Sequence, residues 1–288
     1  YEKNEYNKWV DDSYMLMGKA YMFQGEFFLA AEAFKHIMIT FPQEDIRFAA
    51  MTWLARSYIM VGENREAERI LITLADEGEY PEEYLAELHT TLSQLYITQQ
   101  DYVQAAQELE LALAQKGIHK EEKIRYTYIL AQLYEETEQN SLALEKYKRV
   151  TRYNPTYEMA FNARVSMAEV YEIGLQKSGD LKKLLNKMLR DSKNTEYRDQ
   201  IYFALGNIAM EEGDREQAIE YYQLSVSTSV QNNYQKGSSS LTLAKLFYEE
   251  PDYILSAAYY DSAVSFLDEE YPGYRGLATL SASLSGLV

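Results

Sequence analysis

The chain has 288 residues, of which 47% are apolar, and its 45 acidic against 28 basic residues give a formal net charge of −17. Such a chain repels phosphate groups, which argues against nucleic acid and against an anionic membrane surface as partners. No cysteine is present, which excludes disulfide scaffolds, thiol catalysis and cysteine-bound zinc. The length suits one large domain or a run of repeats.

The dominant pattern is a small residue that recurs every 37 or 38 positions. Its seven copies are Gly18, Ala55, Ser93, Ala131, Ala168, Gly206 and Ala244. A second small residue follows twelve positions later in six copies, namely Ala30, Ala67, Ala105, Ala143, Ala218 and Ser256. Two antiparallel helices approach to about 8–10 Å only where one presents little side chain to the other. Each copy therefore predicts two helices joined by a short polar turn, with an aromatic ring such as that of Tyr134 buried beside the contact.

In chain order, seven predicted units cover the sequence, and the end of the chain begins a further or capping helix. The units span approximately 11–47, 48–85, 86–123, 124–160, 161–198, 199–236 and 237–272, followed by 273–288. We expect one all-α fragment over 1–288, with partial repeats at both ends.

These columns resemble the tetratricopeptide repeat, whose pattern is a large residue, Leu-Gly, Tyr, Ala, an aromatic residue, Ala and Pro. The first copy supplies Tyr14, Met17, Gly18, Tyr21, Ala30, Phe34 and Pro42. The resemblance implies a right-handed superhelical solenoid in which the first helices line a concave groove.

The fifth unit departs from the pattern, because Asp180 stands where a small residue is expected. We predict a longer loop that ends in an Asp180 N-cap, followed by a short helix with four apolar residues inward: Leu181, Leu184, Leu185 and Met188. This stretch also carries a local basic face, which is either a solvated helix face or a docking surface for an acidic partner or headgroup. Its candidate residues are Lys177, Lys182, Lys183, Lys187 and Arg190.

No catalytic motif accompanies the repeats. The three histidines, His36, His89 and His119, fall in different units, and no metalloprotease, phosphate-loop or nucleophile-elbow motif occurs. We therefore predict no enzyme activity and no cofactor. The alternative is binding in the groove, where the tetratricopeptide register places eight candidate contacts: Gln94, Arg125, Tyr128, Gln132, Asn162, Glu169, Phe203 and Asn207. Each is either a peptide contact or a merely solvated side chain.

Four stretches, 8–34, 49–58, 154–164 and 187–209, also resemble one particular family. It is the SprE/PorW family of lipoproteins of the type IX secretion and gliding-motility machinery of Bacteroidota. The resemblance implies a non-enzymatic scaffold on the periplasmic face of the outer membrane that contacts other components of the secretion apparatus.

Two alternatives stay open, a general adaptor that binds a short peptide in its groove and a repeat domain attached to an envelope enzyme. No apolar run approaches about 18 residues, so no membrane-spanning segment is expected. The chain begins at Tyr1 without a signal-like stretch, and we expect a fragment whose targeting segment and any lipid anchor lie outside it.

Overall fold

The structure is a computed structural model that describes residues 9–76, 80–171 and 178–287. All regular structure in these ranges is helical, which confirms the predicted all-α repeat fold. The chain divides into two compact units, Tyr1–Lys146 and Tyr147–Val288, and the boundary falls within one helix. We call them unit 1 and unit 2.

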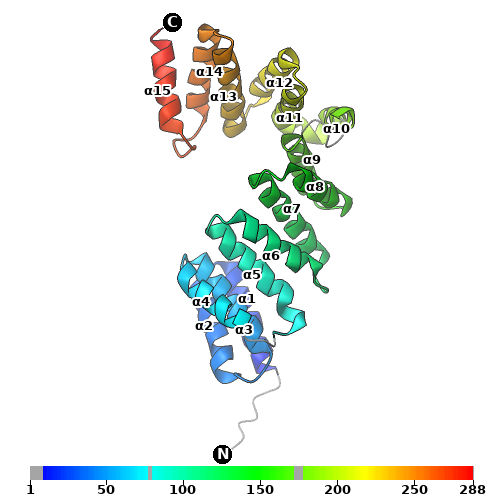
Figure 1. The fold of residues 1–288 in the computed structure, drawn as a ribbon, viewed down its shortest axis with the longest axis vertical. Coiled ribbons are helices and arrows are strands. Elements are labelled where there is room, and N and C mark those ends of the chain that lie inside the picture. Colours follow the sequence, from blue (N-terminus) through cyan, green and yellow to red (C-terminus); the bar gives the residue numbers. More distant parts are fainter. Residues whose placement is uncertain (1–8, 77–79, 172–177, 288) are drawn as a thin grey trace, which may run out of the picture. The chain divides into compact units, whose positions relative to one another are not determined.

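Unit 1 consists of consecutive helix pairs, which Figure 1 shows in chain order from blue to green. Its helices are α1 (Val10–Gln24), α2 (Phe27–Thr40), α3 (Ile46–Met60), α4 (Asn64–Asp76), the 3₁₀ turn η1 (Glu82–Tyr84), α5 (Leu85–Thr98), α6 (Tyr102–Ala114) and α7 (Lys120–Glu136). The next helix, α8 (Asn140–Arg152), contains the boundary. The helices α1, α3 and α5 each pack against the second helix of their own pair, and α1 packs against α3 as α3 packs against α5.

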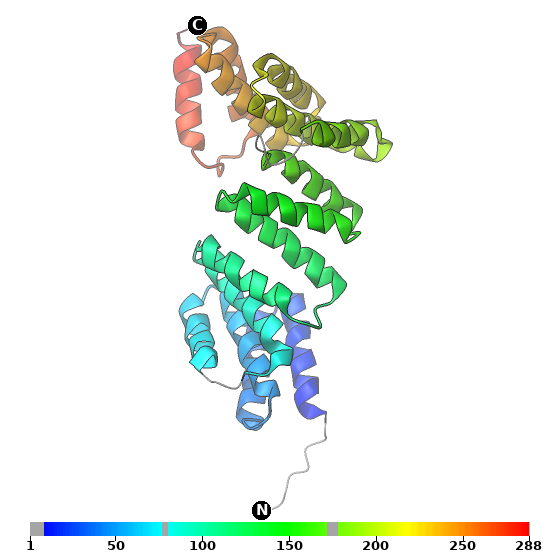
Figure 2. The same ribbon diagram turned by 45° about the vertical axis from the view of Figure 1, so that its right-hand side comes forward.

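Unit 2 repeats this arrangement. Its elements are α9 (Tyr157–Glu169), α10 (Ser178–Arg190), the 3₁₀ turn η2 (Ser192–Tyr197), α11 (Arg198–Glu211), α12 (Arg215–Thr228), α13 (Asn233–Glu249), α14 (Tyr253–Phe266) and α15 (Tyr274–Ser285). Helix α15 packs against α14, and both views place α13, α14 and α15 side by side (Figure 1 and Figure 2).

The small residues of both columns are buried where the two helices of a pair meet. Ala55 and Ala67 of the second pair and Ala105 of the third pair have no exposed surface. A large side chain of the second helix covers the small residue of the first. In the first pair a methyl group at Gly18 would come within 2.5 Å of the Phe34 ring, and in the sixth pair one at Gly206 would come as close to the Tyr222 ring. The helices can therefore approach closely only because these positions carry almost no side chain.

The turns inside the helix pairs share a backbone conformation. A residue with positive φ recurs at the start of the turn, and non-glycine residues occupy it at Gln100 (φ 61°) and Glu138 (φ 56°). An aspartate then caps the second helix in three pairs, where Asp101, Asp214 and Asp252 each accept a hydrogen bond from the backbone N–H three residues later. The left-handed residue reverses the chain and the cap satisfies a free N–H group of the new helix.

The fifth pair corrects one expectation. Helix α10 begins at Ser178, so Asp180 lies in its first turn and the prediction of Asp180 as the N-cap is wrong. An acidic side chain in the first turn still stabilises the helix, because its negative charge lies at the positive end of the helix dipole. Three of the four apolar residues expected inward are buried, namely Leu181, Leu185 and Met188. Leu184 is half-buried.

Candidate functional site

A hollow of about 540 Å³ lies within unit 1, and we call it the N-terminal hollow. Most of its lining comes from the first helices α1, α3, α5 and α7, so side chains from four successive helix pairs meet there. They include Met22, Phe23, Trp53, Arg56, Met60, Glu87, Thr90, Gln94, Arg125 and Tyr126. A lining contributed by four successive helix pairs is the arrangement by which helical repeats bind segments of a partner chain.

The indole ring of Trp53 forms the floor of the hollow and is 8% exposed. Its Nε1 donates a hydrogen bond to Glu87 Oε2 at 2.9 Å, and Lys19 Nζ pairs with Glu87 Oε1 at 2.8 Å. Lys19 Nζ also lies 4.7 Å from the centre of the indole ring. Lys19 thus compensates the negative charge of Glu87. The hydrogen bond from the Trp53 indole to Glu87 fixes the orientation of the indole ring, and Lys19 lies over that ring.

Arg56 is the second cation on this ring, with Cζ 4.5 Å from the ring centre. Its Nη2 donates to Thr90 Oγ1 at 2.8 Å, but its buried Nε has no hydrogen-bond partner. Among the described residues no carboxylate forms an ion pair with this guanidinium. Burial lowers the pKa of Arg56, although arginine stays protonated at neutral pH. A partly satisfied guanidinium is therefore held in place by stacking, with donor capacity left for another group.

Apolar side chains surround this polar centre. Phe23 is 84% exposed and Met60 is 45% exposed, so both present apolar surface beside the polar centre. The Met60 sulfur accepts a hydrogen bond from Gln94 Nε2 at 3.2 Å, and the Met22 sulfur accepts one from Ser57 Oγ at 3.1 Å. Methionine adapts its shape to different contacts, so this part of the hollow can accommodate varied apolar side chains.

Tyr126 adds a neutral hydroxyl to the lining. Burial raises the pKa of Tyr126, while the nearby positive charge of Arg56 acts in the opposite direction. The phenol therefore stays protonated across the physiological range and can donate a hydrogen bond.

The structure brings two of the sequence-predicted groove residues into the N-terminal hollow, Gln94 and Arg125. Tyr128 is half-buried on α7 and Gln132 is exposed on the same helix, and neither lines this hollow. The other four candidates belong to unit 2. Asn162 and Glu169 are exposed on α9. Phe203 and Asn207 are half-buried, because Tyr222 of α12 packs on the first at 5.3 Å between ring centres and donates a hydrogen bond to the second at 2.9 Å.

The residues of the predicted basic face differ in exposure. Lys183, Lys187 and Arg190 are exposed on α10, where their spacing of four and three residues places them on one face. Lys182 is half-buried and forms an ion pair with Glu212. Lys177 lies outside the described residues.

The histidines are separated in the structure as well. His36 packs against the ring of Tyr14 at 4.0 Å between ring centres, and His89 Nδ1 lies 2.7 Å from Glu108 Oε2. His119 precedes α7 as its N-cap residue. Within the described ranges, no three or more His, Asp or Glu side chains are grouped as metal ligands, and no helix has the length and apolarity needed to cross a membrane.

Sequence reasoning missed Trp53 and Arg56 as site residues. Arg56 directly follows the small residue Ala55, just as Gln94 follows Ser93, so both occupy the same groove-facing column of their repeats. Extending that column to the second repeat would have identified Arg56. No sequence signal indicates its stacking on Trp53, because that contact depends on side-chain orientation.

Comparisons with known proteins agree with this description. A family model of the tetratricopeptide repeat matches residues 199–229. A search of curated proteins finds no match. Residues 199–229 therefore match a tetratricopeptide repeat, within a chain whose fold is a helical repeat.

Several solved structures share the fold at low sequence identity. A tetratricopeptide repeat protein from Parabacteroides merdae is 14% identical with a TM-score of 0.56, over 95% of this chain and 99% of that chain. The apo form of RapI is 11% identical with a TM-score of 0.64, over 92% and 79% of the two chains. A Rap protein complexed with Competence and Sporulation Factor is 14% identical with a TM-score of 0.53, over 88% and 75%.

Proposed function

We propose that the chain is a non-enzymatic scaffold for partner proteins, and that unit 1 binds an extended segment of a partner in the N-terminal hollow. The tetratricopeptide-type fold supports an interaction role in general. The single observation that carries the specific proposal is Arg56, a guanidinium stacked on Trp53 with a buried, unpartnered Nε in a hollow lined by four helix pairs.

The surroundings of Arg56 favour a segment that carries a carboxylate next to an apolar side chain. Glu87 pairs with Lys19, and Glu87 and Glu122 act on Arg56 through their charge without an ion pair to its guanidinium among the described residues. A carboxylate of the partner accepts hydrogen bonds from the guanidinium, and such charge-assisted bonds are stronger than neutral ones. The neighbouring apolar side chain covers Phe23 and Met60, which otherwise expose apolar surface.

A similar fold carries a bound factor elsewhere, since the Rap protein was solved in complex with Competence and Sporulation Factor. The likeness shows a shared fold, and the proposal for this chain depends on its own hollow. We further propose, from the family resemblance, that the partners are components of the type IX secretion and gliding-motility apparatus and that the chain acts at the periplasmic face of the outer membrane.

Trp53 gives a direct readout for the hollow. Trp9, the other tryptophan, is replaced by phenylalanine so that Trp53 is the only source of indole fluorescence. The probe is a capped hexapeptide with one glutamate between leucines, and its matched control carries glutamine in place of glutamate. We expect the glutamate peptide to bind about tenfold more tightly, which is the range of one charge-assisted hydrogen bond.

Two arginine variants locate the effect. Arg56→Met keeps the length of the side chain and should abolish the preference for glutamate, whereas Arg65→Met changes an exposed arginine of α4 and should leave it intact. Equal affinity for the two peptides, or an unchanged preference in Arg56→Met, would refute the proposal for the hollow.

The secretion role needs a separate experiment. Affinity capture from cell-envelope extracts should recover components of the secretion apparatus with the parent chain and fewer with Arg56→Met. Recovery of only unrelated proteins, or equal recovery with both chains, would count against this role of the hollow.

A further inference from the structure

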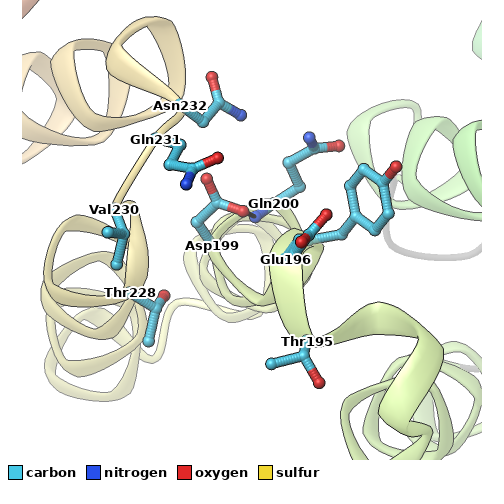
Figure 3. Close-up of a pocket in the computed structure, with 9 residues that line it drawn as sticks. Thr195, Glu196, Asp199, Gln200, Thr228, Val230, Gln231 and Asn232 are labelled. Atoms are coloured by element: carbon cyan, nitrogen blue, oxygen red, sulfur yellow. Dashed lines mark hydrogen bonds between the residues drawn. The ribbon is translucent and has the colours of Figure 1, made fainter.

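A second hollow, of about 480 Å³, lies within unit 2 and is separate from the N-terminal hollow. It is bounded by the end of η2, the first turn of α11 and the connection from α12 to α13. Figure 3 shows its lining, in which Asp199, Gln200, Gln231 and Asn232 converge from these segments. We call it the acidic pocket.

Asp199 is the unusual residue of this pocket, because its side chain is only 1% exposed. Its Oδ1 accepts a hydrogen bond from the backbone N–H of Gln200 at 2.9 Å, and its Oδ2 accepts one from Ser229 Oγ at 2.9 Å. The Asn232 side chain and the backbone N–H of Asp199 also hydrogen-bond to this carboxylate, and together these neutral donors hold it in place without bringing a positive charge beside it.

No cation compensates this buried charge within the described part of the chain. Arg198 is adjacent to Asp199 in sequence but forms no ion pair with it, and no lysine, arginine or histidine lines the pocket. A buried carboxylate without a cation is costly, and bringing a positive charge beside it recovers that cost. Burial raises the pKa of Asp199, against the opposing effect of the hydrogen bonds from Ser229, from the backbone N–H groups of Gln200 and Asp199, and from Asn232.

The rest of the lining is also suited to a donor. Glu196 contributes a second, exposed carboxylate, and the side-chain amides of Gln200, Gln231 and Asn232 and the hydroxyls of Thr195 and Thr228 offer further oxygen acceptors. The Tyr197 ring at the same pocket provides an aromatic face of the kind that attracts cations.

From this cavity and its uncompensated carboxylate, we propose that the acidic pocket binds a lysine or arginine side chain of a partner polypeptide. The volume exceeds that of a water molecule, about 30 Å³, many times over, so the pocket has room for a long side chain with its flanking backbone. Val230 at the rim is 85% exposed and can contact the aliphatic part of that side chain. The net charge of −17 also favours a basic partner.

The proposal concerns unit 2 alone and does not depend on the function proposed for the N-terminal hollow. Its test is a nuclear magnetic resonance titration of the full 288-residue chain that follows the side-chain amide signals of Gln231 and Asn232. The probes are capped pentapeptides with one central lysine, arginine or glutamine between glycines, together with butylammonium as a free amine.

We expect the lysine and arginine peptides to shift both amide signals saturably and the glutamine peptide to leave them unchanged. Asp199→Asn, which is nearly isosteric, should weaken binding about tenfold or more, because a charge-assisted hydrogen bond and a charge pair are lost. Glu196→Gln removes an exposed carboxylate without disturbing the core and should weaken binding severalfold. Glu216→Gln, an exposed site on α12 away from the pocket, should have no effect.

Three results would overturn the proposal. The first is equal shifts with the lysine and glutamine peptides, or no shift with any peptide. The second is unchanged affinity in both Asp199→Asn and Glu196→Gln. The third is equal affinity for butylammonium and the lysine peptide, which would assign the pocket to small amines rather than to a polypeptide.

Discussion

Replacing Gly18 by alanine tests the close helix contact on which the repeat is built. Gly18 lies in the interior of α1, and a Cβ atom there would be 2.5, 2.7 and 2.9 Å from three carbons of the Phe34 ring. The ring has no exposed surface, and its other side faces Trp53 at 6.1 Å between ring centres. The ring therefore has little room to move away from a new methyl group.

Two opposing effects set the magnitude. Alanine in a helix interior is favoured over glycine by about 1 kcal/mol. Forcing an extra carbon into a packed core costs about 1–3 kcal/mol, and the upper end applies here because a contact near 2.5 Å involves a rigid, buried ring. We expect Gly18→Ala to lower the free energy of unfolding by about 2 kcal/mol.

The assay is urea unfolding followed by Trp53 fluorescence in the Trp9→Phe background, which reports on the ring next to Phe34. A second measurement makes the sign decisive. In a chain that already carries Phe34→Leu the clash is removed, and adding Gly18→Ala should then raise the free energy of unfolding by up to about 1 kcal/mol. If Gly18→Ala stabilised both chains equally, the contact between Gly18 and Phe34 would not limit the helix approach.

Three further predictions concern single sites. Gln100 has a left-handed backbone, which is strained for a residue with a Cβ atom, and Gln100→Gly removes that strain. The free energy of unfolding measured by urea titration should rise by about 1 kcal/mol. A loss of stability would contradict the turn geometry. Tyr134→Ala should lower the free energy of unfolding by about 3–5 kcal/mol, since this ring is buried as predicted; a change below about 1 kcal/mol would mean the ring is not packed. Because the pKa of Asp199 is raised above 3.8 in the folded state, folding binds a proton at this carboxyl more tightly than the unfolded chain does. The free energy of unfolding of the wild type should therefore fall relative to that of Asp199→Asn as the pH rises from 3.8 through the pKa of the folded state. Parallel profiles of unfolding free energy against pH would refute this.

The helical repeat could be predicted from the sequence because its signal is local and periodic. Ala105 and Ala143 stand at equivalent positions of successive repeats, and both are fully buried. A small residue is needed wherever the two helices of a pair meet. The same requirement therefore recurs in every repeat, even where the residues at the other repeat positions differ between copies.

The site depends on contacts that periodicity does not encode. Arg56 and Glu87 belong to neighbouring repeats, and both contact Trp53 through side-chain orientations that no column specifies. Phe203 and Asn207 stand in groove-facing columns of α11, yet both contact Tyr222 of α12, the second helix of the same pair. The beginning of α10 was misplaced because Asp180 is a good capping residue that also suits the first turn of a helix.

The central claim is that a partner protein occupies the N-terminal hollow, and site-specific photocrosslinking tests it most directly. A benzophenone amino acid replaces Gln94 in the hollow, and in a matched strain it replaces Ile72, which is 56% exposed on the second helix α4. In cells that produce the protein at its natural level, the account predicts a crosslinked partner from position 94 that disappears with Arg56→Met, and none from position 72. Crosslinks from position 72 alone, or crosslinks from position 94 that persist in Arg56→Met, would contradict it.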